Sequence, residues 1–147
     1  MKKILFPFLI LLLISASCSQ QSKGLLNSYL SSKEALVSSD EQAAKTAISK
    51  MNESFKSDAK YSKNKELGAA IARLNEAGDL KSQRNAFALV SVLMWNATKE
   101  NPKPSKPLYY QYCPMKDAYW ISESSTIENP YYGDEMLECG VVKDVLK

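Results

Sequence analysis

The sequence predicts a mainly α fold, an antiparallel four-helix bundle with a short irregular or β C-terminal tail packed against it. Three observations lead to this prediction. The chain has 147 residues, which is the length of one domain. Apolar residues recur at helical spacing in four segments before residue 100. The connections between these segments are mostly short, which favours antiparallel neighbours, and the composition changes after a proline-rich stretch.

The N-terminus has the pattern of an export signal. Two lysines follow Met1, residues 4–14 are almost wholly apolar, and small residues precede Cys18. The apolar run is shorter than the roughly 20 residues that a membrane span requires. We therefore expect a lipoprotein signal peptide over residues 1–17, lipidation at Cys18 and a tether over 18–24. An ordinary cleaved signal before an incidental cysteine is the alternative. The expected location is the outer membrane, facing the periplasm, with the acyl chains as the membrane contact.

Residues 25–37 form the first predicted helix, because their apolar residues follow a 3.6-residue period. The second helix is expected to begin at Ser39, where Gln42 three residues later completes a capping-box pattern. Its apolar stripe consists of Ala43, Ala44, Ala47, Ile48, Met51 and Phe55.

The third and fourth helices lie on either side of Gly78. The third is expected over about 64–77 and to end at Gly78, since glycine commonly follows the last helical residue. The fourth begins near Asp79, a good N-cap, and is the most apolar of the four, so it should be the most buried. Arg84 lies within its apolar run. We expect Arg84 to pair with an acid or to cap a neighbouring chain segment.

A proline-rich linker over residues 101–107 separates the helical bundle of residues 25–100 from a tail, residues 108–147, that completes the same domain. Aromatic and β-branched residues in the tail predict two short strands, 108–112 and 118–122. The remaining predicted elements are a turn at 129–133, one helical turn at 134–138 ended by Gly140, and a short apolar closing element at 141–146. Packing on the bundle explains the many tail aromatics, and a platform for a flat ligand is the alternative.

Charge and composition exclude several classes of function. Residues 19–106 carry 14 basic against 9 acidic side chains, whereas residues 107–147 carry 3 against 7. This distribution differs from the single basic face of a nucleic-acid-binding protein, so no nucleic-acid partner is expected. The chain has no histidine, which removes His-dependent nucleophiles and His-ligated metal sites. No acidic pair, phosphate-binding loop or C-x-x-C motif indicates catalysis, and we expect no enzyme activity.

Two tail cysteines each have a methionine nearby. Cys113 and Met115 are two residues apart, which in an extended segment places both side chains on one side. Met136 and Cys139 are three apart, which in a helical turn places them on one face. If the pairs meet, two thiolates and two thioethers form a soft-donor site for Cu(I) or Ag(I). The same two cysteines can instead form a structural disulfide in an oxidising compartment, or remain free buried thiols.

Several motifs carry a resemblance to a known family. In the tail they are Cys113-Pro114-Met115, Trp120-Ile121-Ser122, Asn129-Pro130-Tyr131-Tyr132-Gly133, Met136-Leu137 and Cys139-Gly140. In the helical part they are Tyr29-Leu30, Lys33-Glu34-Ala35-Leu36, Asp40 and Arg84-Asn85-Ala86-Phe87. At these residues the chain resembles an uncharacterised domain, a domain of unknown function, of Bacteroidetes-type exported lipoproteins. Such domains also occur fused to periplasmic adaptors of copper/silver efflux pumps, so the resemblance implies copper handling in the cell envelope.

We therefore expect an envelope lipoprotein that binds a soft metal, Cu(I) or Ag(I), for buffering or for hand-off to an efflux adaptor or another envelope protein. The expected ligands are Cys113, Met115, Met136 and Cys139. The residues expected to shield them from water are Tyr112, Trp120, Tyr131 and Tyr132. The alternative is a non-enzymatic protein-interaction domain in which a Cys113–Cys139 disulfide is a structural staple. Metal binding requires the four sulfurs to converge, whereas a staple requires only the two cysteines to meet.

Overall fold

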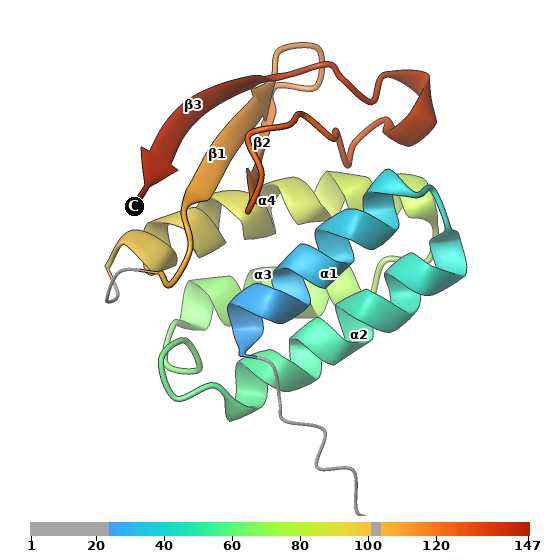
Figure 1. The fold of residues 1–147 in the computed structure, drawn as a ribbon. Coiled ribbons are helices and arrows are strands. Elements are labelled where there is room, and N and C mark those ends of the chain that lie inside the picture. Colours follow the sequence, from blue (N-terminus) through green and yellow to red (C-terminus); the bar gives the residue numbers. More distant parts are fainter. Residues whose placement is uncertain (1–23, 101–103) are drawn as a thin grey trace, which may run out of the picture.

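The computed structural model describes residues 24–100 and 104–147. This part of the chain is mainly helical, as predicted, with four helices followed by a three-stranded antiparallel sheet (Figure 1). The helices are α1 (Leu25–Val37), α2 (Glu41–Ser57), α3 (Lys65–Asn75) and α4 (Leu80–Lys99). The strands are β1 (Leu108–Cys113), β2 (Ala118–Ser122) and β3 (Val141–Leu146), and a short 3₁₀ helix, η1 (Gly133–Glu135), precedes β3. The predicted signal peptide and Cys18 lie outside the described residues.

The start of α2 differs from the prediction. The Asp40 carboxylate accepts the N–H of Ala43 at 2.9 Å, so Asp40 is the cap and the helix begins at the next residue. The expected start at Ser39, with a capping box to Gln42, is therefore wrong. Ser39 has a φ of 57° and belongs to the tight turn that connects α1 to α2.

The caps of α3 and α4 are side chains as well. Asn64 accepts the N–H of Leu67 at 3.0 Å, and Asp79 accepts the N–H of Ser82 at 2.8 Å, which confirms Asp79 as the cap of the fourth helix. The expected stop at Gly78 is wrong, because α3 ends three residues earlier and Gly78 does not adopt the left-handed conformation that glycine provides at helix ends.

Helix α4 is the centre of the fold. It packs against α3 and also against β2, while α1 packs on α2 and α2 on α3 (Figure 1). Eight of its residues are buried, more than in any other helix, as its apolar composition predicts. Phe87, Val90 and Met94 have no exposed surface. Burial of each such side chain contributes about 1.5–3 kcal/mol to folding.

The tail forms more regular structure than its sequence predicts. β2 has the predicted boundaries, and β1 runs one residue further than predicted, to Cys113. The closing segment, expected only as an apolar element, forms β3 and pairs with β1 on the side opposite to β2. The predicted helical turn is shorter, since η1 ends at Glu135.

One edge of the sheet is closed by hydroxyl groups from outside it. The hydroxyl of Tyr29 on α1 accepts the N–H of Ile121 at 3.0 Å, and the hydroxyl of Tyr131 donates to the carbonyl of Tyr119. Both backbone groups belong to β2 and face away from β1. Ser91 on α4 lies 2.7 Å from the Tyr29 hydroxyl, so the network ties α1, α4 and β2 together. Because an unpaired buried backbone group is costly, these hydroxyls stabilise the position of β2.

The two faces of the sheet are covered differently. On one face, Trp95 of α4 stacks on Tyr110 with ring centroids 4.6 Å apart, and Tyr110 stacks on Tyr119 at 4.7 Å. Burial in this row raises the pKa of Tyr110 to about 12. On the other face, the segment 123–140 folds back over the strands, and the Gln111 amide donates to two of its carbonyls at 3.0 Å each. The tail therefore buries its aromatics between α4 and its own return segment.

Arg84 links the tail to the helices. Its guanidinium donates to the carbonyls of Leu36 at 2.9 Å and Pro130 at 2.8 Å, and to the Ser39 hydroxyl at 2.9 Å. The expectation that Arg84 caps a neighbouring segment is therefore confirmed: one planar side chain satisfies the C-terminal end of α1 and the turn before η1.

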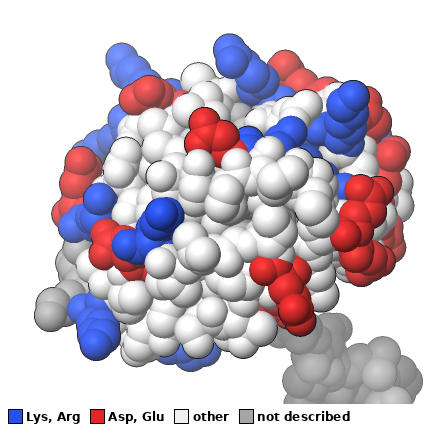
Figure 2. All heavy atoms as spheres, turned by 90° about the horizontal axis from the view of Figure 1, so that it is seen from above, with Lys and Arg blue, Asp and Glu red and all other residues white. Residues whose placement is uncertain are grey.

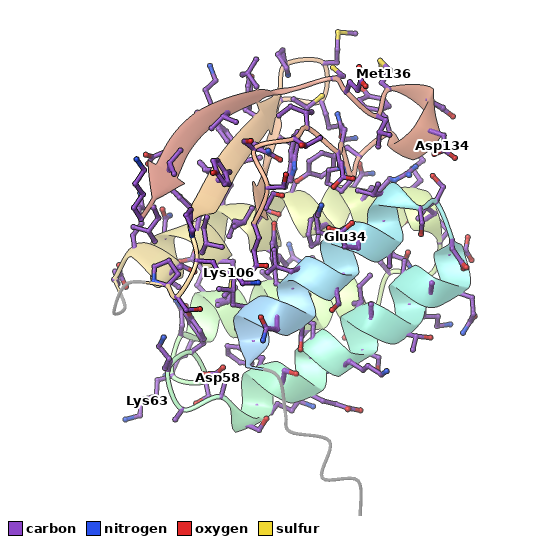
Figure 3. The ribbon with its side chains drawn as sticks, viewed as in Figure 1. Glu34, Asp58, Lys63, Lys106, Asp134 and Met136 are labelled. Atoms are coloured by element: carbon purple, nitrogen blue, oxygen red, sulfur yellow. The ribbon has the colours of Figure 1, made fainter. Side chains whose placement is uncertain are left out.

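Lys33 makes a second link, which no local pattern in the sequence predicts. Its side chain is only 1% exposed and pairs with Glu34 at 2.6 Å and with Glu128 at 3.3 Å. Glu34 lies on α1 (Figure 3), whereas Glu128 belongs to the return segment of the tail. A buried ammonium requires such partners, so this pair fixes the segment on the helix.

The surface seen from the side of the sheet has a broad central area without charge. Charged side chains lie mostly around its rim, and acidic ones gather at the end that holds η1 (Figure 2). Within the described residues, no helix is both long enough and apolar enough to cross a membrane.

Candidate functional site

The structure brings the two tail cysteines together. Cys113 is the last residue of β1 and has no exposed surface, and Cys139 is half-buried in the segment just before β3. Their sulfur atoms are 3.7 Å apart, and both are free thiols. Two distant parts of the tail therefore present a sulfur pair at one point, as both the metal and the disulfide interpretations require.

Asn129 positions Cys139. Its buried amide donates to the carbonyl of Cys139 at 2.7 Å, and its side-chain oxygen accepts the N–H of Tyr131 at 2.8 Å. Its backbone N–H bonds the carbonyl of Leu137 at 2.8 Å, and its carbonyl accepts the N–H of Gly133 at 3.0 Å. The sequence predicts only a turn here, and no local pattern indicates these bonds of the Asn129 side chain. A buried asparagine with four such bonds holds the whole loop in one conformation.

Gly140 lets the cysteine segment approach the sheet closely. A Cβ at this position would lie 2.7 Å from the Trp120 ring and 3.2 Å from the carbonyl of Tyr112. Only glycine fits there without displacing the indole. The backbone that carries Cys139 therefore lies directly against β1 and β2.

The methionines are arranged differently from the prediction. Met115 lies on the turn between β1 and β2, and its side chain is 68% exposed. The rule that residues two apart point the same way applies within a strand, but β1 ends at Cys113, and the chain turns through Asp117 at a φ of 51°. Met136 and Cys139 are not in one helical turn either, because η1 ends before Met136, although the N–H of Cys139 does bond the carbonyl of Met136 at 3.1 Å.

Met136 is half-buried next to η1 and lies at the end of the molecule opposite Asp58 and Lys63 (Figure 3). The described geometry thus brings together the two cysteines, with Met136 three residues before Cys139 in the same loop. It leaves the Met115 thioether in solvent.

The residues expected to shield the sulfurs surround them in part. Trp120 is fully buried and packs beside Cys139 through Gly140, and Tyr131 is buried with its ring 6.1 Å from that of Trp120. Tyr132 is half-buried against the core. Tyr112 instead directs its hydroxyl outward to Asp117 at 2.8 Å.

The Cys113 thiol affects the acidity of its neighbour. A hydrogen bond between the two sulfurs raises the pKa of Cys139, and burial acts in the same direction, whereas the backbone N–H of Met115 acts in the opposite one. The raised pKa keeps the Cys139 thiol protonated at neutral pH, so a cation that binds this sulfur must displace its proton.

No competing site of hard ligands is present in the described part of the chain. No three His, Cys, Asp or Glu side chains gather there into a metal-holding group. A cavity of about 270 Å³ lies near the start of α1, but its charged groups are already engaged. Asp58 accepts the N–H groups of Leu25 and Lys60, both at 2.9 Å, and Lys106 pairs with Glu123 at 3.2 Å.

Comparison with known proteins identifies the family through the helical part. The profile of a family described as "Protein of unknown function (DUF3347)" matches residues 25–106. The chain belongs to the DUF3347 family. No curated protein and no solved structure matches it. The DUF3347 match covers α1 to α4 and the linker as far as residue 106 and stops before β1, so the sulfur pair lies outside the matched residues.

Membership in DUF3347 agrees with the predicted resemblance to an uncharacterised domain. The lipoprotein type, the tail motifs and the occurrence beside efflux adaptors stay predictions.

Proposed function

We propose that this DUF3347 protein binds a soft metal ion, Cu(I) or Ag(I), through Cys113 and Cys139. The observation that carries the proposal is the 3.7 Å separation of the two sulfurs, one buried and one half-buried. Two thiolates that bind one tetrahedral ion at about 2.3 Å lie about 3.8 Å apart, so this pair needs almost no movement to share an ion.

Softness of the donors selects the ion. Beside the thiols, the soft donors nearest in the chain are the thioethers of Met136 and Met115, and there is no histidine. In the described residues no carboxylate joins the two cysteines in a metal-holding group. Thiolates and thioethers favour Cu(I) over Mg²⁺, Ca²⁺ and, without nitrogen or carboxylate, over Zn²⁺. Met136 would supply a third sulfur from the same loop, and the exposed Met115 would join by rotation of its side chain.

The proposed setting is the cell envelope. Residues 1–17 are a lipoprotein signal peptide and Cys18 is the lipidated residue, followed by a tether over 18–24. The protein then buffers the ion at the outer membrane, facing the periplasm, or hands it to an efflux adaptor or another envelope protein. The antiparallel bundle of residues 25–100, the linker 101–107 and the tail 108–147 form one domain. No catalysis is part of this proposal.

The alternative function is a non-enzymatic interaction domain stapled by a Cys113–Cys139 disulfide. One observation favours it: Met115 is 68% exposed, so the four sulfurs do not converge. The two sulfurs are 3.7 Å apart, against about 2 Å in a disulfide, so the two side chains must move closer before they can be bridged.

A Cu(I) competition titration tests the proposal. The chain from Ser19, fully reduced, is titrated against a chromophoric Cu(I) chelator. One equivalent should bind tightly, Cys113→Ser should abolish uptake, and Met136→Leu should weaken it. Met51→Leu, a buried methionine of α2, is the matched control and should change nothing. Absence of uptake by the reduced chain would contradict metal binding. Thiols that react with thiol reagents only after reduction would then support the staple.

A further inference from the structure

Strand β3 carries an unusual concentration of exposed apolar side chains. Five large hydrophobic residues of the described chain are exposed, and three of them, Val141, Val142 and Val145, lie on this strand. A fourth, Met115, lies on the turn next to the start of β3. Figure 2 shows that the surface on the side of the sheet has few charges in its central area. An exposed apolar edge of this kind is an interaction site unless something covers it.

The hydrogen bonds of β2 determine which way the backbone N–H and C=O groups of β3 point, because β1 pairs with both strands. Ile121 and Tyr119 direct their N–H and C=O away from β1, to the two tyrosine hydroxyls. Successive residues of an antiparallel strand direct their backbone groups to opposite sides. Trp120, which lies between Tyr119 and Ile121, therefore directs its N–H and C=O toward β1, where its partner is Gln111. Gln111 therefore directs its backbone toward β2, and its partner on the other side, Val142, directs its own backbone outward.

The backbone of Val145 has the same outward direction as that of Val142. Val145 is the partner of Tyr109, which lies two residues before Gln111 and has the same orientation. The N–H of Val145 bonds the Asp144 carboxylate at 2.8 Å, as expected for a donor that has no strand on that side. Val142 and Val145 thus present the open backbone edge of the sheet.

An irregularity makes this edge self-complementary. The pairing with β1 shifts between Tyr110 and Gln111, so that Lys143 is an extra residue of β3. As a result, the backbone groups of Val142 and Val145 both point outward, and their side chains lie on the same face of the sheet, although the two residues are three apart. In a regular strand, residues three apart would differ in both.

We propose that β3 pairs with β3 of a second copy of the chain, antiparallel, about a two-fold axis between Lys143 and Asp144. Val142 of each copy then lies opposite Val145 of the other, and their outward N–H and C=O groups bond to each other. Such β-strand addition gives affinity through the backbone and specificity through the side chains.

The charges of Lys143 and Asp144 favour pairing of β3 with a second copy over pairing with an unrelated strand. The Lys143 ammonium lies 5.3 Å from the Tyr112 ring centroid, and Asp144 is the partner of Tyr110, which shares a face with Tyr112. Lys143 and Asp144 therefore lie on one face, where pairing about the axis sets each lysine opposite the aspartate of the other copy. The Asp144 carboxylate leaves its own Val145 N–H on pairing and gains this lysine.

Sedimentation equilibrium of the chain from Ser19 tests the proposal, since every contact described above lies within residues 24–147. The expected result is a reversible monomer–dimer equilibrium. Val145→Pro removes an outward N–H that no strand of its own copy uses, and should leave a folded monomer. Leu89→Thr, an exposed apolar residue on α4, is the matched control and should leave the dimer unchanged.

A charge exchange separates this pairing from a general loss of folding. Asp144→Lys sets lysines opposite each other and should weaken the dimer at least tenfold, whereas the double variant Lys143→Asp with Asp144→Lys should restore it. A monomer at every concentration up to the millimolar range would overturn the proposal. So would a dimer that Val145→Pro and Asp144→Lys leave intact, since it would use another surface.

Discussion

The side-chain amide of Asn129 donates a 2.7 Å hydrogen bond to the carbonyl of Cys139. This bond fixes one half of the sulfur pair from ten residues away, and its donor has no exposed surface. The position of Cys139 thus depends on a residue that contributes no sulfur.

Replacement of Asn129 by alanine should therefore destabilise the loop that carries Cys139. We expect a loss of about 1–3 kcal/mol in the free energy of unfolding, because buried backbone groups lose their partner. Urea denaturation followed by circular dichroism measures this loss. Asn96→Ala, on the exposed face of α4, is the control and should change stability little. Equal effects of the two variants would contradict the role of Asn129.

Gly140→Ala should destabilise the fold through a steric clash. Its Cβ would lie 2.7 Å from the Trp120 ring, and overpacking of this kind costs about 1–3 kcal/mol. Gly78→Ala is a matched control, because a Cβ there meets nothing within 4 Å. It should be neutral or slightly stabilising. Thermal unfolding of both variants measures the difference in their stability. Equal melting temperatures would show that the Trp120 ring moves aside without cost and would contradict the clash.

Arg84→Lys should loosen the tail from the helices although the charge is kept. A lysine ammonium cannot reproduce the planar fork that reaches Leu36, Ser39 and Pro130 together. We expect a cost of about 1–3 kcal/mol from carbonyls left without a donor. Hydrogen exchange should show faster exchange in the tail, with little change for Arg73→Lys on the exposed side of α3. Unchanged tail protection in Arg84→Lys would argue against this role.

The cap of α4 should make stability depend on acid pH. Hydrogen bonds from the backbone and side chain of Ser82 lower the pKa of Asp79 below its ordinary value. A carboxyl group with a lowered folded pKa stabilises the fold above its unfolded pKa, and this contribution is lost as the pH falls through the folded value. Asp79→Asn keeps the cap without the titration. Its stability should fall less than that of the native chain on acidification, and parallel pH profiles would contradict the assignment.

Much of the helical part can be predicted from the sequence because its determinants are local. Periodicity places α1 at its observed boundaries, and Asp79 is recognisable as a cap from its neighbours alone. The start of α2 was misplaced because Ser39 and Asp40 are both capping residues, and the contact of Ser39 with the distant Arg84 is invisible in the sequence.

The candidate site is predictable only in part, for the same reason. The meeting of Cys113 and Cys139 agrees with their even number and spacing, but the expected positions of Met115 and Met136 depended on a continuing strand and a full helical turn. The chain forms neither at those residues. The bonds of Asn129 and Lys33 join segments far apart in the sequence, and no local pattern predicts them.

The position of the sheet on α4 has a consequence for where the family boundary falls. The DUF3347 match ends at residue 106, yet Phe87 and Trp95 of α4 face rings that come after that point, at Tyr131 and Tyr110. A fragment cut at the end of the match would expose these rings to water and leave Arg84 without one of its acceptors. The segment that the family match recognises is thus shorter than the unit that folds cooperatively. A fragment ending at residue 106 should aggregate under conditions in which the chain from Ser19 stays soluble.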